Sequence, residues 1–149
     1  MNLIEFPSNE YLLKNRDLIF VRSNGNKELI GRCLVIYPND NKVTFSGFCI
    51  RFRPTANTIN TVYLSHLFRI PVFRAVMLQG GKGANIQNLN QKTLERLKIP
   101  MPSIELQNQF EQIVEKTEAL KTQYQQSLQE LENLYGSLSQ KAFKGELKQ

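Results

Sequence analysis

The sequence predicts an α+β protein, with a small mixed α/β domain over residues 1–100 followed by a long C-terminal coiled-coil helix over residues 101–149. Three observations lead to this prediction. Short apolar runs separated by turn residues fill the first third of the chain, and helical spacing of apolar residues begins at residue 60. One amphipathic pattern then continues from Ile104 to Ala142. A chain of 149 residues is long enough for one compact domain and such an appendage.

Residues 11–53 have the pattern of strands joined by polar turns. The expected strands are residues 18–21, 29–37, 43–45 and 48–53. In the last of them, bulky apolar side chains alternate with cysteine and arginine, so the two kinds face opposite sides of a sheet. The apolar set is Phe48, Ile50 and Phe52, and the opposite set includes Arg51 and Arg53. This alternation predicts a sheet with a core face and an arginine-bearing ligand face.

Helical spacing follows at residues 60–79, and Pro71 is expected to divide it into two short helices because proline lacks the backbone N–H. A further helical turn is predicted at residues 91–97. The glycine-rich segment 79–84 is predicted to be a turn. It is not a phosphate-binding P-loop, because the G-x-x-x-x-G-K-[ST] spacing is absent.

The long helix is expected to begin after Ser103, a good N-cap residue, with Glu105 favoured in the first turn by the helix dipole. With Phe110 at heptad position a, apolar residues recur at the alternating spacing of a coiled-coil seam. The a and d positions are Phe110, Ile113, Thr117, Leu120, Tyr124, Ser127, Leu131, Leu134 and Leu138. A second row at position e widens the apolar stripe and consists of Val114, Leu128, Tyr135 and Ala142.

This stripe is too wide and too long for one neighbour. A two-stranded coil leaves position e partly wet, so the helix is expected to contact more than one partner. The alternative is a helix packed only on its own domain. That alternative is disfavoured because the helix spans about 58 Å, whereas a domain of this size is about 26 Å across. Gly136 lies at an outer position, where it costs roughly 1 kcal/mol of helix stability.

The net charge of +6 is distributed unevenly. Residues 1–100 carry fourteen Lys and Arg against six Asp and Glu, whereas residues 101–149 carry five Lys against seven Glu. The basic part is therefore the N-terminal domain, which favours a polyanion partner such as nucleic acid. The alternative is a basic surface that only keeps the domain soluble.

The remaining composition excludes several classes of protein. No apolar run is long enough for a transmembrane helix, and residues 1–7 do not have the pattern of a secretory signal, which favours the cytoplasm. Cys33 and Cys49 could form a disulfide, but two small buried thiols in a reduced compartment are the favoured interpretation. With only His66 beside them, a metal site is not expected. His66 is interpreted as an ordinary, partly buried histidine.

Seven short sequence stretches occur in a distinctive order along the chain. They are residues 17–25 (DLIFVRSNG), 28–32 (ELIGR), 45–48 (FSGF), 83–90 (GANIQNLN), 99–102 (IPMP), 105–109 (ELQNQ) and 141–147 (KAFKGEL). Each is weak alone, but in this order and spacing they resemble the DNA-specificity (S) subunit of type I restriction–modification enzymes. The resemblance covers the whole chain, with its target-recognition domain and its conserved long helix.

The resemblance implies a function. Such subunits carry two target-recognition domains, each recognising one half of a split DNA sequence, and two long antiparallel helices that act as a spacer. Adenine methyltransferase subunits dock on those helices, and a restriction subunit can join the complex. The specificity subunit is not an enzyme and needs no cofactor. In agreement, the sequence has no Ser/His/Asp set and no Asn-Pro-Pro-aromatic signature of an adenine methyltransferase.

The chain departs from the family pattern in two ways. It has one recognition domain and one long helix, and it is expected to lack the front of the recognition domain because strand-like sequence begins almost at once. Two copies paired antiparallel through their helices would rebuild a two-headed subunit with twofold symmetry and would recognise an inverted repeat. Pairing with another specificity chain is left open.

Side chains that can recognise bases or hold phosphates are the candidate DNA contacts. They are Arg22, Ser23, Asn24, Lys27, Arg32, Arg51, Arg53, Lys82 and Asn85. Arginine pairs with guanine and asparagine with adenine, so Arg22 and Asn24 are the expected base contacts, whereas lysines contact phosphates. The alternative for each arginine is a solvated charge or a salt bridge. The candidate partner-binding residues of the helix are Phe110, Ile113, Val114, Leu120, Tyr124, Leu128, Leu131, Leu134 and Leu138.

Three hypotheses follow from these observations. The first is a DNA-recognising half-subunit that dimerises through its helix. The second is a truncated fragment that does not recognise DNA and whose helix binds the methyltransferase or another specificity subunit. The third, an unrelated coiled-coil scaffold with a basic domain, is disfavoured by the seven stretches. The first two differ in whether the N-terminal domain binds DNA.

Overall fold

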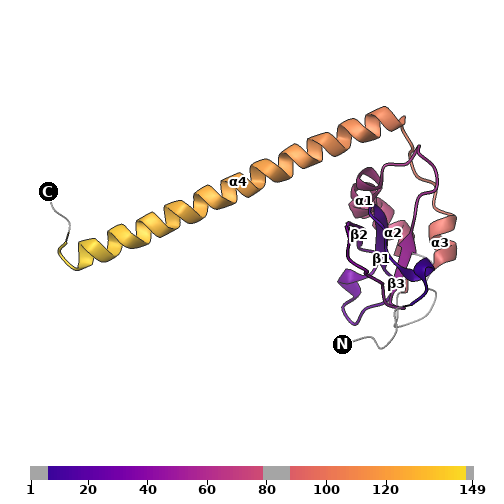
Figure 1. Cartoon of the computed structure of the whole chain (residues 1–149), viewed down its shortest axis with the longest axis horizontal. Helices are drawn as coiled ribbons and strands as arrows, with labels where there is room; N and C mark the ends of the chain where they lie inside the picture. Colours follow the sequence, from indigo (N-terminus) through magenta and orange to yellow (C-terminus); the bar gives the residue numbers. More distant parts are fainter. Residues whose placement is uncertain (1–6, 79–87, 147–149) are drawn as a thin grey trace. The chain divides into compact units, whose positions relative to one another are not determined.

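A computed structural model describes residues 7–78 and 88–146 of the chain (Figure 1). The chain divides into two compact units, Met1–Asn108 and Gln109–Gln149. The elements of the described residues are η1 (Asn9–Tyr11), β1 (Asp17–Val21), η2 (Lys27–Leu29), β2 (Cys33–Ile36), β3 (Cys49–Phe52), α1 (Thr61–Arg69), α2 (Pro71–Leu78), α3 (Gln91–Glu95) and α4 (Ile104–Phe143). These elements confirm the predicted α+β class.

Within the described residues, three strands form an antiparallel sheet in the order β2-β1-β3. The prediction of a strand at residues 43–45 is wrong, since those residues have no regular secondary structure. The strand predicted at 29–37 is shorter than expected. Asn26 accepts a hydrogen bond from the Glu28 N–H and starts the 3₁₀ turn η2, and Gly31 then turns the chain with a φ of 79°. Glycine adopts this left-handed conformation without steric cost, so β2 begins only afterwards.

The core of the first unit lies between the sheet and α1 (Figure 1). Leu18 and Phe20 of β1 are almost fully buried, and Ile50 of β3, paired with Phe20, packs on the same face. Phe20 meets Phe68 of α1 edge to face, with ring centroids 5.2 Å apart. The predicted core position of Phe48 is wrong, because Phe48 precedes β3 and is 68% exposed.

The helices predicted at 60–79 form on both sides of Ile70, and α2 begins at Pro71 as expected. The side-chain oxygen of Asn60 accepts hydrogen bonds from the N–H groups of Val62 and Tyr63, so α1 begins directly after it. Asn90 caps the short helix α3 in the same way, by accepting a hydrogen bond from the Thr93 N–H. His66 of α1 is partly buried, as predicted.

Gln107 attaches the first turn of α4 to the rest of the first unit. Its side chain is 1% exposed and makes three hydrogen bonds: Oε1 accepts from the Asn60 N–H, and Nε2 donates to the carbonyls of Thr58 and Pro102. The Asn60 side chain donates in turn to Asn108 Oδ1 over 2.9 Å. This network gives a structural role to the Gln-Asn pair of the sequence stretch 105–109.

The predicted start of α4 is confirmed, since Ile104 directly follows Ser103. The pKa of the Glu105 carboxyl lies below its ordinary value because it accepts hydrogen bonds from its own backbone N–H and from Ser103. At the other end, Gly145 has a φ of 72°, and the Glu146 N–H bonds back to the Lys141 carbonyl over 2.8 Å. This is the geometry of a Schellman stop.

Arg53 and Asp17 form an ion pair that joins the end of β3 to the start of β1. Arg53 Nε donates to Asp17 Oδ1 over 2.7 Å, and Nη2 donates to Oδ2 over 2.6 Å. The Asp17 side chain is almost fully buried and also accepts a hydrogen bond from the Lys14 N–H. Such a bidentate pair is strong because both groups are charged and the geometry is fixed.

We expect this ion pair to make stability depend on pH. Burial alone would raise the pKa of Asp17, but hydrogen bonds from Arg53 and Lys14 and the charges of Arg53 and Arg51 outweigh it, so the pKa is lowered. The unfolded carboxyl titrates near ~3.9. The stabilisation is therefore complete above about pH 4 and is lost as the pH falls through the lower folded-state value.

Urea titrations from pH 6 to pH 2.5 should show this loss. Asp17→Asn should lack that part of the slope, and equal slopes in both proteins would contradict the assignment.

Both cysteines lie in the described residues and both are free thiols; Cys33 is buried as predicted, whereas Cys49 is only partly buried. Cys33 is buried beneath α1, and burial raises the pKa of its thiol to about 11, with the charge of Arg69 acting weakly in the opposite direction. The thiol therefore stays protonated at neutral pH. Among the described residues, no helix is long and apolar enough to cross a membrane.

The second unit consists mainly of α4, a single helix of 40 residues counted from Ile104. Tyr124 is 70% exposed and Leu131 63%. The predicted stripe is thus exposed to solvent along most of the helix. The other half-exposed or more exposed apolar residues of this stripe are Ile113, Leu120, Leu128, Leu134, Tyr135 and Leu138.

Candidate nucleic-acid interface

The segment after β1, residues 22–27, forms an exposed polar loop, called here the 22–27 loop. Its backbone is fixed at its start: the N–H groups of Arg22 and Ser23 both donate to the Phe48 carbonyl, over 2.8 and 3.3 Å. The Arg22 carbonyl accepts a hydrogen bond from the Leu89 N–H over 3.0 Å. Because Leu89 is fully buried, the base of the loop is held by the core while its side chains stay exposed.

Local hydrogen bonds shape the rest of the loop. Asn24 Oδ1 accepts from the Asn26 N–H over 2.8 Å, and Asn26 caps η2. Such Asx turns occupy one amide oxygen and leave the side-chain NH₂ group available as a donor. Lys27 lies at the start of η2 with an exposed side chain. Arg32 is also exposed, and its Nε donates to the Glu28 carbonyl over 3.2 Å.

An open hollow of about 440 Å³ adjoins the 22–27 loop. Ser23, Asn24 and Gly25 line one side, and Ser46, Phe48 and Cys49 line the other. The hollow thus combines hydroxyl and amide groups with an exposed aromatic ring. Ser46 and Phe48 are not among the predicted contacts. The alternation of the predicted strand assigned Phe48 to the core. The signal available in the sequence was Gly47, which interrupts the run before β3.

Arg51 and Arg53 lie away from this hollow, toward the opposite end of β3. Cys49 pairs with Val21 beside the 22–27 loop, whereas Arg53 bonds to Asp17 at the start of β1, roughly 13 Å further along the strand. Arg53 is held by Asp17 and by the Leu12 carbonyl. The expected arginine-bearing ligand face is therefore occupied, at least in part, by contacts within the domain.

Arg51 is similarly engaged. Its Nη1 donates to the Glu10 carbonyl and, over 3.4 Å, to the Leu12 carbonyl. Its guanidinium carbon lies 5.4 Å from the centroid of the Phe45 ring. The structure thus divides the nine predicted contacts. It brings Arg22, Ser23 and Asn24 together with Lys27 and Arg32 following, and it separates the two β3 arginines from them. Lys82 and Asn85 lie outside the described residues.

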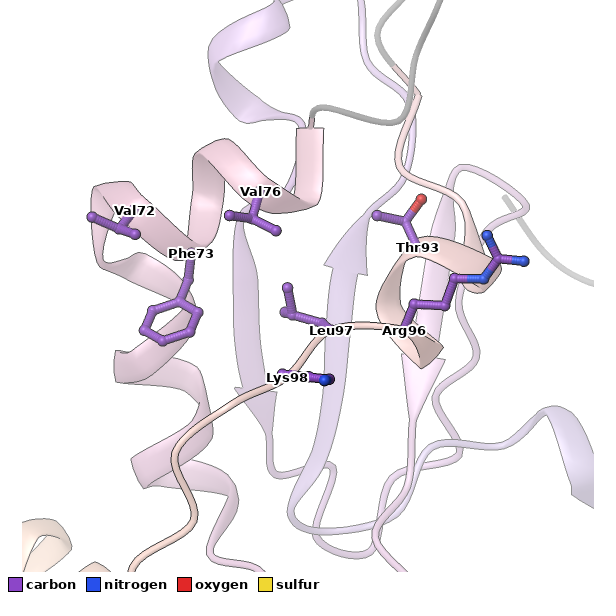
Figure 2. A pocket seen from close by; sticks show the side chains of 7 residues that line it. All are labelled: Val72, Phe73, Val76, Thr93, Arg96, Leu97 and Lys98. Carbon is purple, nitrogen blue, oxygen red and sulfur yellow. The ribbon is translucent and has the colours of Figure 1, made fainter.

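A second hollow, of about 430 Å³, lies between α2 and α3 (Figure 2). Val72, Phe73 and Val76 of α2 form one wall, and Leu97 closes the opposite side together with Thr93. Its two cations are Arg96 and Lys98. None of the predicted site residues lines it. Its mostly apolar lining suits contact with an apolar group.

In the part of the chain that the structure describes, no cluster of three or more His, Cys, Asp or Glu residues could hold a metal ion. What the 22–27 loop and its hollow offer is hydrogen bonding and positive charge. Guanidinium and amide groups can recognise base edges, and lysine can neutralise a phosphate.

Comparison with known proteins extends this picture to the whole chain. Residues 4–133 match a family model described as the type I restriction modification DNA specificity domain. The chain belongs to this family. The match covers both the unit that carries the 22–27 loop and most of α4. It confirms the resemblance inferred from the seven sequence stretches.

Three curated relatives of this DNA specificity domain are specificity subunits of type I restriction enzymes. The chain is 30% identical over 146 residues to the EcoBI subunit of Escherichia coli, a match that covers 90% of the chain and 31% of the relative. It is 27% identical to the StySPI subunit of Salmonella potsdam, with 93% and 31% covered. The EcoKI subunit of E. coli strain K12 is also 27% identical, with 96% and 32% covered. The chain thus spans about a third of each relative's length.

Proposed function

We propose that this chain acts as a half specificity subunit of a type I restriction–modification complex, with one recognition domain and one long helix. Its first unit recognises one half of a split DNA target. Its long helix pairs with a second specificity chain and positions adenine methyltransferase subunits on that target. The chain itself is not an enzyme and contributes only binding.

The observation that carries the proposal is the extent of the family match. It covers residues 4–133 and so includes a basic domain and a long helix in one continuous relationship to DNA specificity domains. A match of the first unit alone would support only DNA recognition. The matched helix adds a surface for assembly with other chains, because its apolar stripe is exposed along most of its length.

The 22–27 loop is the part of the domain best suited to contact DNA. The backbone at its start is anchored to Phe48 and Leu89, so this part of the backbone needs little ordering on binding. Arg22 and Asn24 are proposed to contact base edges, and Lys27 and Arg32 to contact phosphates. Arg51 and Arg53 stay in the proposed set only as secondary contacts, because both are engaged within the domain.

We expect Lys27→Ala and Arg22→Ala to weaken DNA binding in different ways. Lys27→Ala should weaken binding to all sequences alike and reduce the slope of log affinity against log salt by about 1, because one phosphate contact is lost. Arg22→Ala should cost about 1–3 kcal/mol on the target and little on other DNA. Fluorescence anisotropy at several salt concentrations measures both effects. Lys14→Ala, which removes a charge at the far end of β1, is the matched control, and equal effects of Lys14 and Lys27 would contradict the assignment.

An interaction module that does not recognise DNA is the second candidate. The observation that favours it is the width of the exposed stripe, since Leu128 and Tyr135 lie outside the a/d seam and are more than half exposed. A helix with such a stripe can bind a methyltransferase subunit or a longer specificity subunit without any DNA contact by the first unit.

Methylation mapping separates the two candidates. The chain would be co-expressed with an adenine methyltransferase subunit of the same type I system in a host without adenine methylation, and N6-methyladenine would be mapped across the genome. Methylation at a split, inverted repeat is the result expected of a half-subunit pair. Co-purification of the two proteins without methylation would reject DNA recognition and leave the interaction module.

A further inference from the structure

The exposed stripe of α4 is symmetric about Tyr124. Counted along the sequence, its residues recur at the same distances before and after this tyrosine. The pairs at four, seven and eleven residues are Leu120 with Leu128, Thr117 with Leu131, and Ile113 with Tyr135. Phe110 and Leu138 follow at fourteen residues. The stripe therefore has the same spacing in both directions along the helix.

Thr117 fits this symmetry although it carries a hydroxyl. Its Oγ1 donates to the Ile113 carbonyl one turn earlier, over 2.8 Å. The hydroxyl is thus satisfied within the helix, which leaves the methyl group for contact with a partner. The position opposite Leu131 is therefore effectively apolar.

Symmetric spacing has a definite consequence when two copies pair antiparallel. Suppose that a twofold axis passes through one residue of the helix. A residue n positions before that residue then lies level with the partner's residue n positions after it. With the axis at Tyr124, each apolar residue of the stripe meets an apolar residue or the Thr117 methyl group. We propose that, in a pair of two copies with the antiparallel direction that the family resemblance implies, the twofold axis passes through Tyr124. This inference rests on the helix pairing of the proposed function and adds its register.

Neighbouring registers fit the stripe less well. Moving the axis to the midpoint between Gln125 and Gln126 restores a strict a/d seam, but Leu128 then meets the partner's Gln123, and Tyr135 meets the partner's Lys116. The Tyr124 register also gives a role to the apolar residues Leu128 and Tyr135 at position e. The stripe takes four-residue steps on both sides of Tyr124, which changes the repeat locally from seven to eleven residues and brings position e into the seam.

The charges beside the stripe favour the antiparallel direction over a parallel pair. Lys116 and Lys121 occupy heptad positions g and e, so a parallel, in-register coil would bring Lys116 next to the partner's Lys121. In the Tyr124 register, Lys116 lies close in height to the partner's Glu130, on the same flank. On the other flank, Glu118 lies close in height to the partner's Glu132, and Glu118 forms an exposed ion pair with Lys121 of its own helix at 3.6 Å.

Cysteine cross-linking of the full chain tests the direction and the register together. Leu120→Cys and Leu128→Cys proteins would be treated with a short bismaleimide, separately and after mixing under conditions that allow exchange. The Tyr124 register predicts a covalent dimer in the mixture and almost none with either variant alone. Tyr124→Cys alone should cross-link. The unsubstituted chain, which keeps Cys33 and Cys49, gives the background.

The other outcomes overturn the proposal. Cross-linking of Leu120→Cys alone at least as strong as in the mixture would indicate a parallel pair. Strong cross-linking of Leu120→Cys with Leu138→Cys would indicate a shifted register. No cross-link above background in any mixture, with helical content unchanged by circular dichroism, would also reject the proposal. None of these results depends on DNA binding or methylation, so the proposed function stands or falls separately in the methylation map.

Discussion

Replacing Arg53 with alanine is expected to lower the free energy of unfolding by about 3 kcal/mol, because Asp17 would be left charged, buried and without its main partner. The change also removes the hydrogen bond from Arg53 to the Leu12 carbonyl, which ties the segment before β1 to β3. Urea denaturation at pH 7 measures the effect. For a domain of this size such a loss is a large part of the total stability.

Arg32→Ala is the matched control for this experiment. Arg32 is exposed, and its Nε donates a hydrogen bond to the Glu28 carbonyl, so its removal should change the free energy of unfolding by less than about 1 kcal/mol. If Arg53→Ala and Arg32→Ala destabilise the protein equally, the Asp17–Arg53 pair does not have the role assigned to it.

The second large effect is expected from glutamate at two positions of the stripe. Leu120→Glu together with Leu131→Glu should convert the proposed dimer into a monomer, because charges would replace the four leucines that the proposed pair buries. At about 1.5 kcal/mol for each leucine, the loss is at least about 6 kcal/mol, or roughly 10⁴-fold in the dissociation constant. Sedimentation velocity across micromolar concentrations measures this directly.

The control adds the same charges to the opposite face of the helix. Gln126 and Asn133 lie about half a turn away from the stripe, so Gln126→Glu with Asn133→Glu should leave the dimer intact. A dimer that persists in both double variants would show that the stripe is not the pairing surface. A monomer in both would point to net charge as the cause.

The elements predicted correctly from the sequence are those fixed by local patterns. The run 18–21 forms β1 because it is continuously apolar, Pro71 separates α1 from α2 because it cannot donate a hydrogen bond, and α4 follows its own periodicity. The predicted strand at 43–45 failed for a non-local reason. Its residues have suitable side chains, but within the described part of the chain they form no strand ladder: the Val43 carbonyl accepts from the Leu13 N–H, and Thr44 Oγ1 donates to the Tyr11 carbonyl.

The candidate site was harder to predict for the same reason. Alternation correctly placed Arg51 and Arg53 on the face opposite Ile50, but it could not show that Asp17, 36 residues before Arg53, lies opposite on β1. Nor could it show that the Phe48 carbonyl holds the 22–27 loop. Gln107 illustrates the limit most clearly. Within the sequence it is a polar residue at the start of an amphipathic helix, and its burial depends on carbonyls that only the folded domain brings to it.

Under the proposed pairing, the exposed stripe of α4 makes the order of the second unit depend on the concentration of the chain. A lone helix with its apolar residues in water gains no free energy from packing, so its stability rests on weak backbone propensity. Any chain that covers the stripe adds a stabilisation that grows with the logarithm of its free concentration. In the proposed pair, protection of the helix from local unfolding therefore rises gradually with the concentration of the chain.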